Sequence, residues 1–167
     1  MAELSLKERL QPSLLDRLRD DAPEEKKEPS ENRVLSQAGL RESVRRDLIW
    51  LFNSINLSGV QNLDDCPEAA RSVINYGLSE LSGTNVSSID VTEWERMLRQ
   101  AIWNFEPRLI RNTVKVTLTV DEEKMSHSAM TFIVEAQLWS QPMPLQLYLR
   151  TEIDLENRNA DVLEIQG

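Results

Sequence analysis

The apolar residues of this chain recur with a helical period before Pro107 and with a strand period after it. The strongest helical pattern is DVTEWERMLRQAIWNF, in which apolar residues follow one another at spacings of three and four. Asp90 and Glu93 are spaced as an N-cap and its third helical residue, which predicts where this helix begins. A proline disfavours helical geometry in the residue before it, so Pro107 predicts the end. Because the predicted helices precede the predicted strands, the order indicates an α+β fold.

Two earlier segments also have helical signals. One face of LRESVRRDLIWLFNSI is apolar at helical spacing, formed by Val44, Leu48, Leu51 and Ile55. In DDCPEAARSVINYGL, Pro67 suits a first helical position, and Gly77 can adopt the left-handed conformation that closes a helix. These patterns predict one long amphipathic helix and a second, short one.

Three stretches after Pro107 alternate between apolar and polar residues, as strands with one buried face do. The alternating positions are Val114, Val116, Leu118 and Val120; Met130, Phe132, Val134, Ala136 and Leu138; and Leu145, Leu147, Leu149, Ile153 and Leu155. The connections DEEKMSHSAM and SQPMP are too short for a crossover helix, so consecutive strands should pair antiparallel. The prediction is a three-stranded meander with the N-terminal helices packed on one face and with exposed edges to which another strand could add. The tail NRNADVLEIQG is either a further short strand or a strap.

The N-terminal part divides into a short helical segment and a charged linker. Leu14, Leu15 and Leu18 form a short apolar stripe within residues 1–20. Residues 21–35 are charged and contain two prolines, which is typical of a flexible linker. We therefore expect a docking segment over residues 1–20, a linker over 21–35 and one α+β domain over 36–167. A helix on such a tether either docks onto a partner protein or folds back onto its own domain.

The charge and cysteine content argue against several classes of function. A net charge of −9 disfavours nucleic acids and anionic membrane surfaces, which bind clustered Lys and Arg. Cys66 and His127 are the only cysteine and histidine, too few for a disulfide or a zinc site, and we expect no metal or cofactor. The chain has no apolar run of about 18 residues and no signal-peptide pattern, so we expect a cytoplasmic protein without membrane insertion.

Motifs that mark common active sites are also absent from the sequence. It contains no glycine-rich phosphate loop and no HExxH or GxSxG pattern. His127 lies in a polar loop and Cys66 precedes Pro67 without a histidine nearby in sequence, so both fit ordinary structural roles better than catalysis. We expect no catalytic residue.

Glu106 and Arg108 flank Pro107 at the junction between the last helix and the first strand. In an extended segment their side chains project to the same side, and the proline restricts the backbone between them. Two interpretations remain open. The pair is either a local ion pair that fixes the helix end to the sheet, or a recognition element that offers an acceptor and a bidentate donor to another protein.

The string FEPRL, together with PSLLDRL, RESVRRDLIWLFNS and SVINYGLSEL, resembles the TssE subunit of type VI secretion systems. TssE is related to the baseplate wedge protein of contractile phages, a family often labelled lysozyme-like. The resemblance covers residues 12–20 and about 40–155, and the triplet Glu106, Pro107 and Arg108 is its most specific mark.

The resemblance implies a structural role in the baseplate at the cytoplasmic face of the inner membrane. The TssF and TssG subunits would hold the protein near TssK, and the TssB/TssC sheath would begin to polymerise on it. The resemblance also implies that Glu106, Pro107 and Arg108 bind the wedge core, and the tethered stripe of Leu14, Leu15 and Leu18 adds a second candidate contact.

Two other functions remain as alternatives. The lysozyme-like label suggests a peptidoglycan hydrolase, which needs two carboxylates facing a cleft, one of them protonated. A neighbouring cation such as Arg108 favours the ionised form of Glu106 and so does not suit a general acid. The second alternative is a free adaptor protein that binds several partners in turn.

Overall fold

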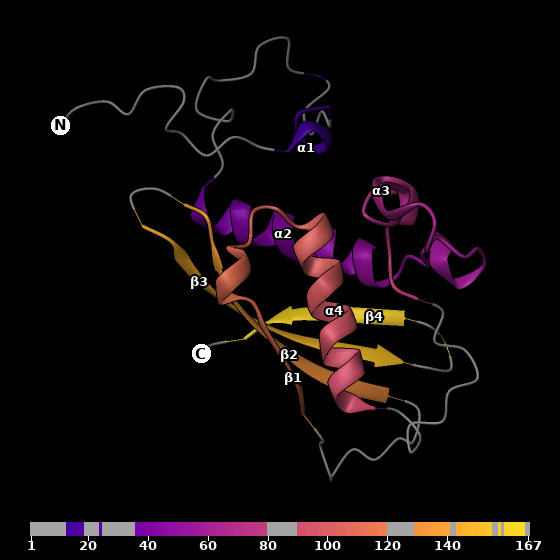
Figure 1. Cartoon of the computed structure of the whole chain (residues 1–167). Coiled ribbons are helices and arrows are strands. Elements are labelled where there is room, and N and C mark those ends of the chain that lie inside the picture. Colours follow the sequence, from indigo (N-terminus) through magenta and orange to yellow (C-terminus); the bar gives the residue numbers. More distant parts are fainter. Residues whose placement is uncertain are drawn as a thin grey trace, which may run out of the picture.

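The computed structural model describes most of the domain and a short N-terminal segment. The described residues are 13–18, 24, 36–79, 90–119, 129–140, 143–154, 157 and 159–165. The predicted linker, apart from residue 24, and His127 lie outside them. The helices come first and the strands last, as predicted for an α+β fold (Figure 1).

The sheet has four antiparallel strands in the order β1-β2-β3-β4, so the prediction of three strands is wrong. The strands are β1 (Lys115–Thr119), β2 (Ala129–Leu138), β3 (Leu145–Asp154) and β4 (Asn159–Glu164). The tail forms β4, in which only Ala160 and Val162 face the core. Two buried positions are too few to establish a period-two pattern, and pairing with β3 is what decides that this segment is a strand.

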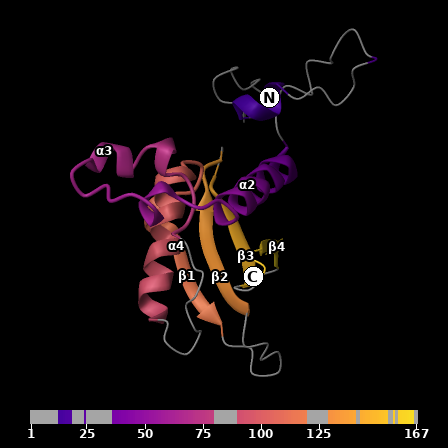
Figure 2. The same ribbon diagram turned by 90° about the vertical axis from the view of Figure 1, so that its right-hand side faces the viewer.

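Two long helices, α2 (Gln37–Phe52) and α4 (Val91–Phe105), lie against the sheet (Figures 1 and 2). Asp90 caps α4 as predicted, since its carboxylate accepts from the backbone N–H groups of Thr92 and Glu93. The predicted helix between Pro67 and Gly77 is broken into α3 (Pro67–Ala70) and the 3-10 turn η3 (Val73–Asn75). Ser72 interrupts it because its side chain accepts from the N–H of Ile74 and starts a new turn. The remaining short elements are α1 (Leu14–Leu18), η2 (Leu57–Gly59) and η5 (Arg111–Thr113).

One hydrophobic core joins the two long helices to the alternating strand positions. α2 runs beside β4 and α4 beside β1. Trp94 of α4 stacks on Phe132 of β2 with ring centroids 6.3 Å apart. The predicted alternation of β2 is confirmed, since each of its five inward residues is buried.

Side chains from the helices cover part of both sheet edges that the sequence predicts as exposed. Asn53 donates to the backbone oxygen of Ala160 at 2.8 Å and accepts from its N–H at 2.9 Å, as a neighbouring strand would. At the opposite edge, the N–H of Leu118 donates to Glu95 Oε1 at 2.8 Å. A strand that added to either edge would first have to replace these groups.

Thr151→Val is expected to raise the free energy of unfolding by about 1 kcal/mol. Thr151 of β3 is fully buried opposite Phe132, and its hydroxyl finds no hydrogen-bond partner among the residues that the structure describes. Valine has nearly the same shape and removes the buried unpaired group. Chemical denaturation would measure the change, and a loss of stability would show that the hydroxyl is hydrogen-bonded in solution.

Candidate functional site

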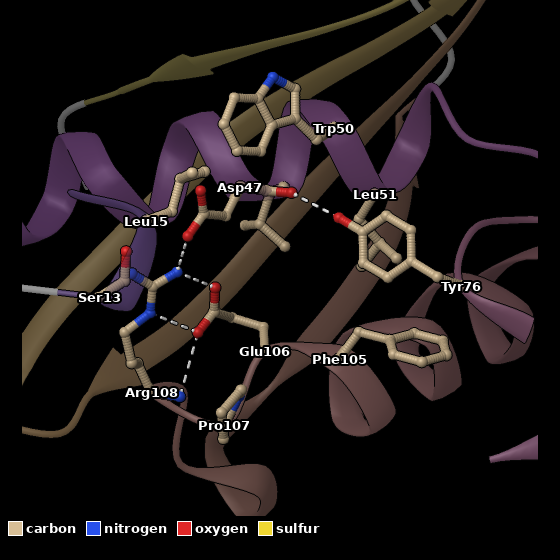
Figure 3. Close-up of a pocket in the computed structure, with 11 residues that line it drawn as sticks. Ser13, Leu15, Asp47, Trp50, Leu51, Tyr76, Phe105, Glu106, Pro107 and Arg108 are labelled. Atoms are coloured by element: carbon tan, nitrogen blue, oxygen red, sulfur yellow. Dashed lines mark hydrogen bonds and ion pairs between the residues drawn. The ribbon is translucent and has the colours of Figure 1, made fainter. Parts of the chain in front are cut away.

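Glu106 and Arg108 form a buried ion pair directly after α4 (Figure 3). The Glu106 side chain is only 3% exposed. Arg108 Nε donates to Oε1 at 2.7 Å, and Arg108 Nη2 donates to Oε2 at 2.5 Å. The backbone N–H of Arg108 also donates to Oε1, at 3.1 Å. Both carboxylate oxygens of Glu106 are therefore engaged by the residue that follows Pro107.

Arg108 also connects the end of α4 to α2. Its Nη1 donates to Ser43 Oγ at 2.9 Å, and its Nη2 donates to Asp47 Oδ2 at 2.5 Å. Burial disfavours the charged guanidinium, but the hydrogen bonds and charges of Glu106 and Asp47 outweigh this and raise the pKa of Arg108 further. The local ion pair that the sequence suggested thus exists, and its contacts extend to α2 as well.

Helix α1 joins the same group of charges through Asp16. Asp16 Oδ2 accepts from Ser13 Oγ at 2.7 Å and from Ser43 Oγ at 2.9 Å, and Oδ1 pairs with Arg46. Burial raises the pKa of Asp16, but the bonds from Arg46 and the two serines hold it well below its usual value. Arg46 in turn pairs with Asp47 at 2.7 Å. We call this network the ion cluster; its members are Asp16, Ser43, Arg46, Asp47, Glu106 and Arg108.

A hollow of about 420 Å³ opens beside the ion cluster (Figure 3). Its lining combines apolar side chains with one charged side, and consists of Ser13, Leu15, Asp47, Leu48, Trp50, Leu51, Tyr76, Phe105, Glu106, Pro107 and Arg108. The Tyr76 hydroxyl donates to the backbone oxygen of Asp47 at 3.3 Å. Burial, reinforced by the negative charges of Asp47 and Glu106, raises the pKa of Tyr76. The hollow is thus an apolar recess with a charged edge.

The three leucines of α1 are largely exposed, and only Leu15 lines the hollow. Leu14 is 70% exposed, Leu15 is 51% exposed and Leu18 is 74% exposed. The polar contacts of α1 with α2 are made by Asp16, which binds Ser43 and Arg46. Of the predicted site residues, the structure brings Leu15 together with Glu106, Pro107 and Arg108 around the hollow.

Sequence reasoning missed the α2 residues of the cluster and Asp16. Arg46 and Asp47 lie on what the pattern predicts as the solvated side of a helix, and Asp16 lies between leucines. Nothing local distinguishes them, because their partners are far away in sequence. The hydroxyl of Ser43, which is itself buried, bonds to residues 27 and 65 positions away.

Other candidate chemistry is not assembled within the described part of the chain. Cys66 is exposed and is the N-cap residue of α3, but its side chain makes no capping hydrogen bond. No group of three or more potential metal ligands comes together among the described residues. Within those same ranges, no helix has both the length and the apolar character needed to span a bilayer.

Comparison with known proteins gives two kinds of match. The chain is 32% identical over 120 residues to the anti-adapter protein IraD of Salmonella arizonae, covering 71% of this chain and 85% of that protein. It is also 32% identical over 107 residues to IraD of Salmonella choleraesuis, covering 64% of this chain and 75% of that protein. No solved structure matches the chain significantly.

A family match covers most of the domain. The model of the baseplate wedge protein gp25 family matches residues 38–143, which include all but the first residue of α2, the whole of α4, β1 and β2, and the Glu106–Arg108 pair. TssE is a member of the same family, so the resemblance noted from the sequence is confirmed. On this evidence, the chain belongs to the baseplate wedge protein gp25 family.

Proposed function

We propose that this protein is a structural subunit of a type VI secretion baseplate wedge, bound by TssF and TssG near TssK. It would work at the cytoplasmic face of the inner membrane and provide the starting point for TssB/TssC sheath polymerisation. The single observation that carries the proposal is the match to the baseplate wedge family over residues 38–143. The FEPRL and PSLLDRL motifs support the narrower assignment to the secretion system.

The proposed contact with the wedge partner is the face that holds the hollow. Glu106, Pro107 and Arg108 line the hollow together with Leu15, and Leu14 and Leu18 are exposed on the same short helix as Leu15. A binding face needs an apolar centre with a polar rim, and the lining of the hollow has this composition. The proposed sheath contact is a sheet edge, where an added strand would replace Asn53 at β4 or Glu95 at β1.

The geometry of the ion pair supports a binding role over hydrolysis. A glycoside hydrolase needs a protonated carboxyl group that can deliver its proton to the substrate. Both oxygens of Glu106 instead accept hydrogen bonds from Arg108, in a bidentate arrangement that suits an ionised carboxylate. No function as an enzyme is proposed.

The IraD matches favour one second candidate, a free binding protein. Those relatives are named anti-adapter proteins, and this chain covers 85% of one of them. A regulator of this kind would form separate binary complexes, whereas a wedge subunit would enter one complex at a fixed ratio.

Mixing the full-length chain with purified TssF and TssG is expected to give a complex of fixed stoichiometry. Size-exclusion chromatography with light scattering would measure the masses. Leu15→Glu places a charge on the proposed face and should weaken this complex at least tenfold. The matched control is Val73→Glu, which changes an exposed residue in η3, outside the lining of the hollow, and should leave binding unchanged. The wedge assignment fails if wild-type protein forms no complex, or forms only interchangeable binary complexes.

A peptidoglycan-release assay on the same samples tests the hydrolase alternative. We expect no release by wild-type protein. Release by wild-type protein that disappears in Glu106→Gln would establish catalysis instead.

A further inference from the structure

Helix α1 is attached to the domain in the reverse of the usual amphipathic arrangement. Its polar residue Asp16 contacts α2, while Leu14 and Leu18 are more than two thirds exposed and Leu15 is half exposed at the border of the hollow. A helix of five residues is not stable in water on its own. Fixing the backbone of the first turn costs more free energy than the few hydrogen bonds of so short a helix supply. Its contacts to Ser43 and Arg46 therefore hold α1 in place while leaving its apolar side uncovered.

Leu15 joins α1 to the hollow, and Leu14 and Leu18 are exposed on the same helix. Leu15 lines the hollow together with Trp50, which is 46% exposed. The Arg46 guanidinium lies over the Trp50 ring, 4.8 Å from its centroid. Buried Leu51 and partly buried Phe105 also line the hollow. A helix laid along α1 could cover the leucines and insert one apolar side chain into the recess.

The charges beside this surface indicate which sign of charge a partner should carry. Among the described side chains, the ion cluster contains three carboxylates, those of Asp16, Asp47 and Glu106, but only two guanidiniums, those of Arg46 and Arg108. Among these described side chains the carboxylates therefore exceed the guanidiniums by one, in a chain whose net charge is −9. A lysine or arginine beside the apolar residues of the partner would complement it.

Glu106 and Arg108 are connected to α1 through Ser43 and Asp47. Ser43 Oγ accepts from Arg108 Nη1 and donates to Asp16, so it joins the two ends of the cluster. Asp47 accepts from Arg108 and pairs with Arg46, which pairs with Asp16. Four of the five guanidinium N–H groups of Arg108 are donated within the chain, which leaves little capacity for a partner.

We propose that α1 and the hollow behind it form one docking surface for an apolar helix that carries a flanking lysine or arginine, and that Glu106 and Arg108 act as positioning residues. In this arrangement the pair contributes to binding by holding Ser43 and Arg46 against Asp16, and so by keeping α1 in place, instead of by touching the partner. The inference rests on the proposed function for the identity of the natural partner, but its chemistry can be tested without TssF or TssG.

The probe is a designed amphipathic helical peptide of leucine and lysine, with a leucine–glutamate peptide as its counterpart. Isothermal titration calorimetry on the full-length chain is expected to show binding of the lysine peptide and at least tenfold weaker binding of the glutamate peptide. Changing all three α1 leucines to serine should weaken binding at least tenfold. The matched control, Val73→Ser with Ile74→Ser, removes equally exposed apolar residues from η3 and should change binding less than twofold.

Asp16→Ala separates positioning from direct contact. It releases α1 from the cluster but leaves the Glu106–Arg108 pair intact, so it should weaken peptide binding at least tenfold without altering circular dichroism melts of the domain. Arg108→Lys should also weaken peptide binding in the wild-type background. In the Asp16→Ala background it should cause no further loss of peptide binding, because α1 is already released. An additive effect of Arg108→Lys would show that Arg108 touches the partner and would overturn its positioning role.

Three further results would overturn the docking surface itself. The first is no binding of the lysine peptide, and the second is an equal loss of peptide binding in the η3 control. The third is dimerisation of wild-type protein through the α1 leucines, detected by analytical ultracentrifugation, which would mean that a second copy of the chain occupies the surface. If TssF and TssG fail to bind while the peptide result holds, the proposed function fails and the docking surface stands. If they bind Asp16→Ala as tightly as wild type, the inference fails and the proposed function stands.

Discussion

Arg108→Ala is expected to lower the free energy of unfolding by about 3 kcal/mol, because it leaves a buried carboxylate without its partner. Glu106 is 3% exposed, and both of its oxygens accept from Arg108. The same substitution removes the bonds from Arg108 to Ser43 and Asp47, so the end of α4 loses these polar contacts with α2. Urea denaturation followed by circular dichroism would measure the loss.

Two control variants identify the cause of this loss. Combining Arg108→Ala with Glu106→Ala should cost less than the sum of the two single changes, since the double variant leaves no unpaired charge at this position. Arg96→Ala breaks an ion pair with Glu93 in which both side chains are more than half exposed, and should change stability little. If Arg108→Ala unfolds at the same denaturant concentration as wild type, the ion pair does not stabilise the domain.

Gly77→Ala is expected to destabilise the domain by about 3 kcal/mol, because this position requires a glycine backbone. Gly77 has a φ of +118°, and a Cβ atom there would lie 2.3 Å from the backbone oxygen of Ser54. That oxygen accepts from the N–H of buried Leu78 at 2.8 Å. The segments around Ser54 and Gly77 therefore cannot separate without losing this hydrogen bond. For a chain of this size the loss corresponds to a melting temperature lower by about 10 °C.

Gly39→Ala is the matched control for this substitution. Gly39 lies in the first turn of α2, where alanine favours the helix, so a small gain in stability is expected. Thermal melts of both variants should therefore shift in opposite directions. A Gly77→Ala protein that melts with the wild type would mean that the turn relaxes without cost.

The parts of the fold that follow from local pattern could be predicted from the sequence. The start of α4 at Asp90 and its end before Pro107 depend on capping and on proline geometry, which involve only neighbouring residues. The alternation of β2 is also local, and all five of its predicted core residues are buried. β4 could not be predicted in the same way, because it is short and its pairing partner β3 determines its conformation.

The candidate site was predictable only in part. Glu106 and Arg108 are close in the chain, so a contact between them could be predicted. The geometry differs from the expected extended segment, because Pro107 and Arg108 lie in a turn in which the N–H of Leu109 donates to the backbone oxygen of Glu106 at 3.3 Å. The orientation of α1 could not be inferred, because an apolar stripe ordinarily packs toward its own domain. Here the contact is made by Asp16, whose partners are Ser43 and Arg46 in another helix.

By itself, the sequence determined the order of the elements, the limits of the strongest helix, the alternating faces of the strands and the family motif. Each of these depends on residues that are close together in the chain. Only the tertiary structure decided that the Glu106–Arg108 pair is buried, that it connects to α2 and α1, and that the leucines of α1 remain exposed. The physical reason is that hydrogen bonds and ion pairs among Asp16, Ser43 and Arg108 join residues 27 and 65 positions apart, and which of many polar side chains meet depends on how the core packs.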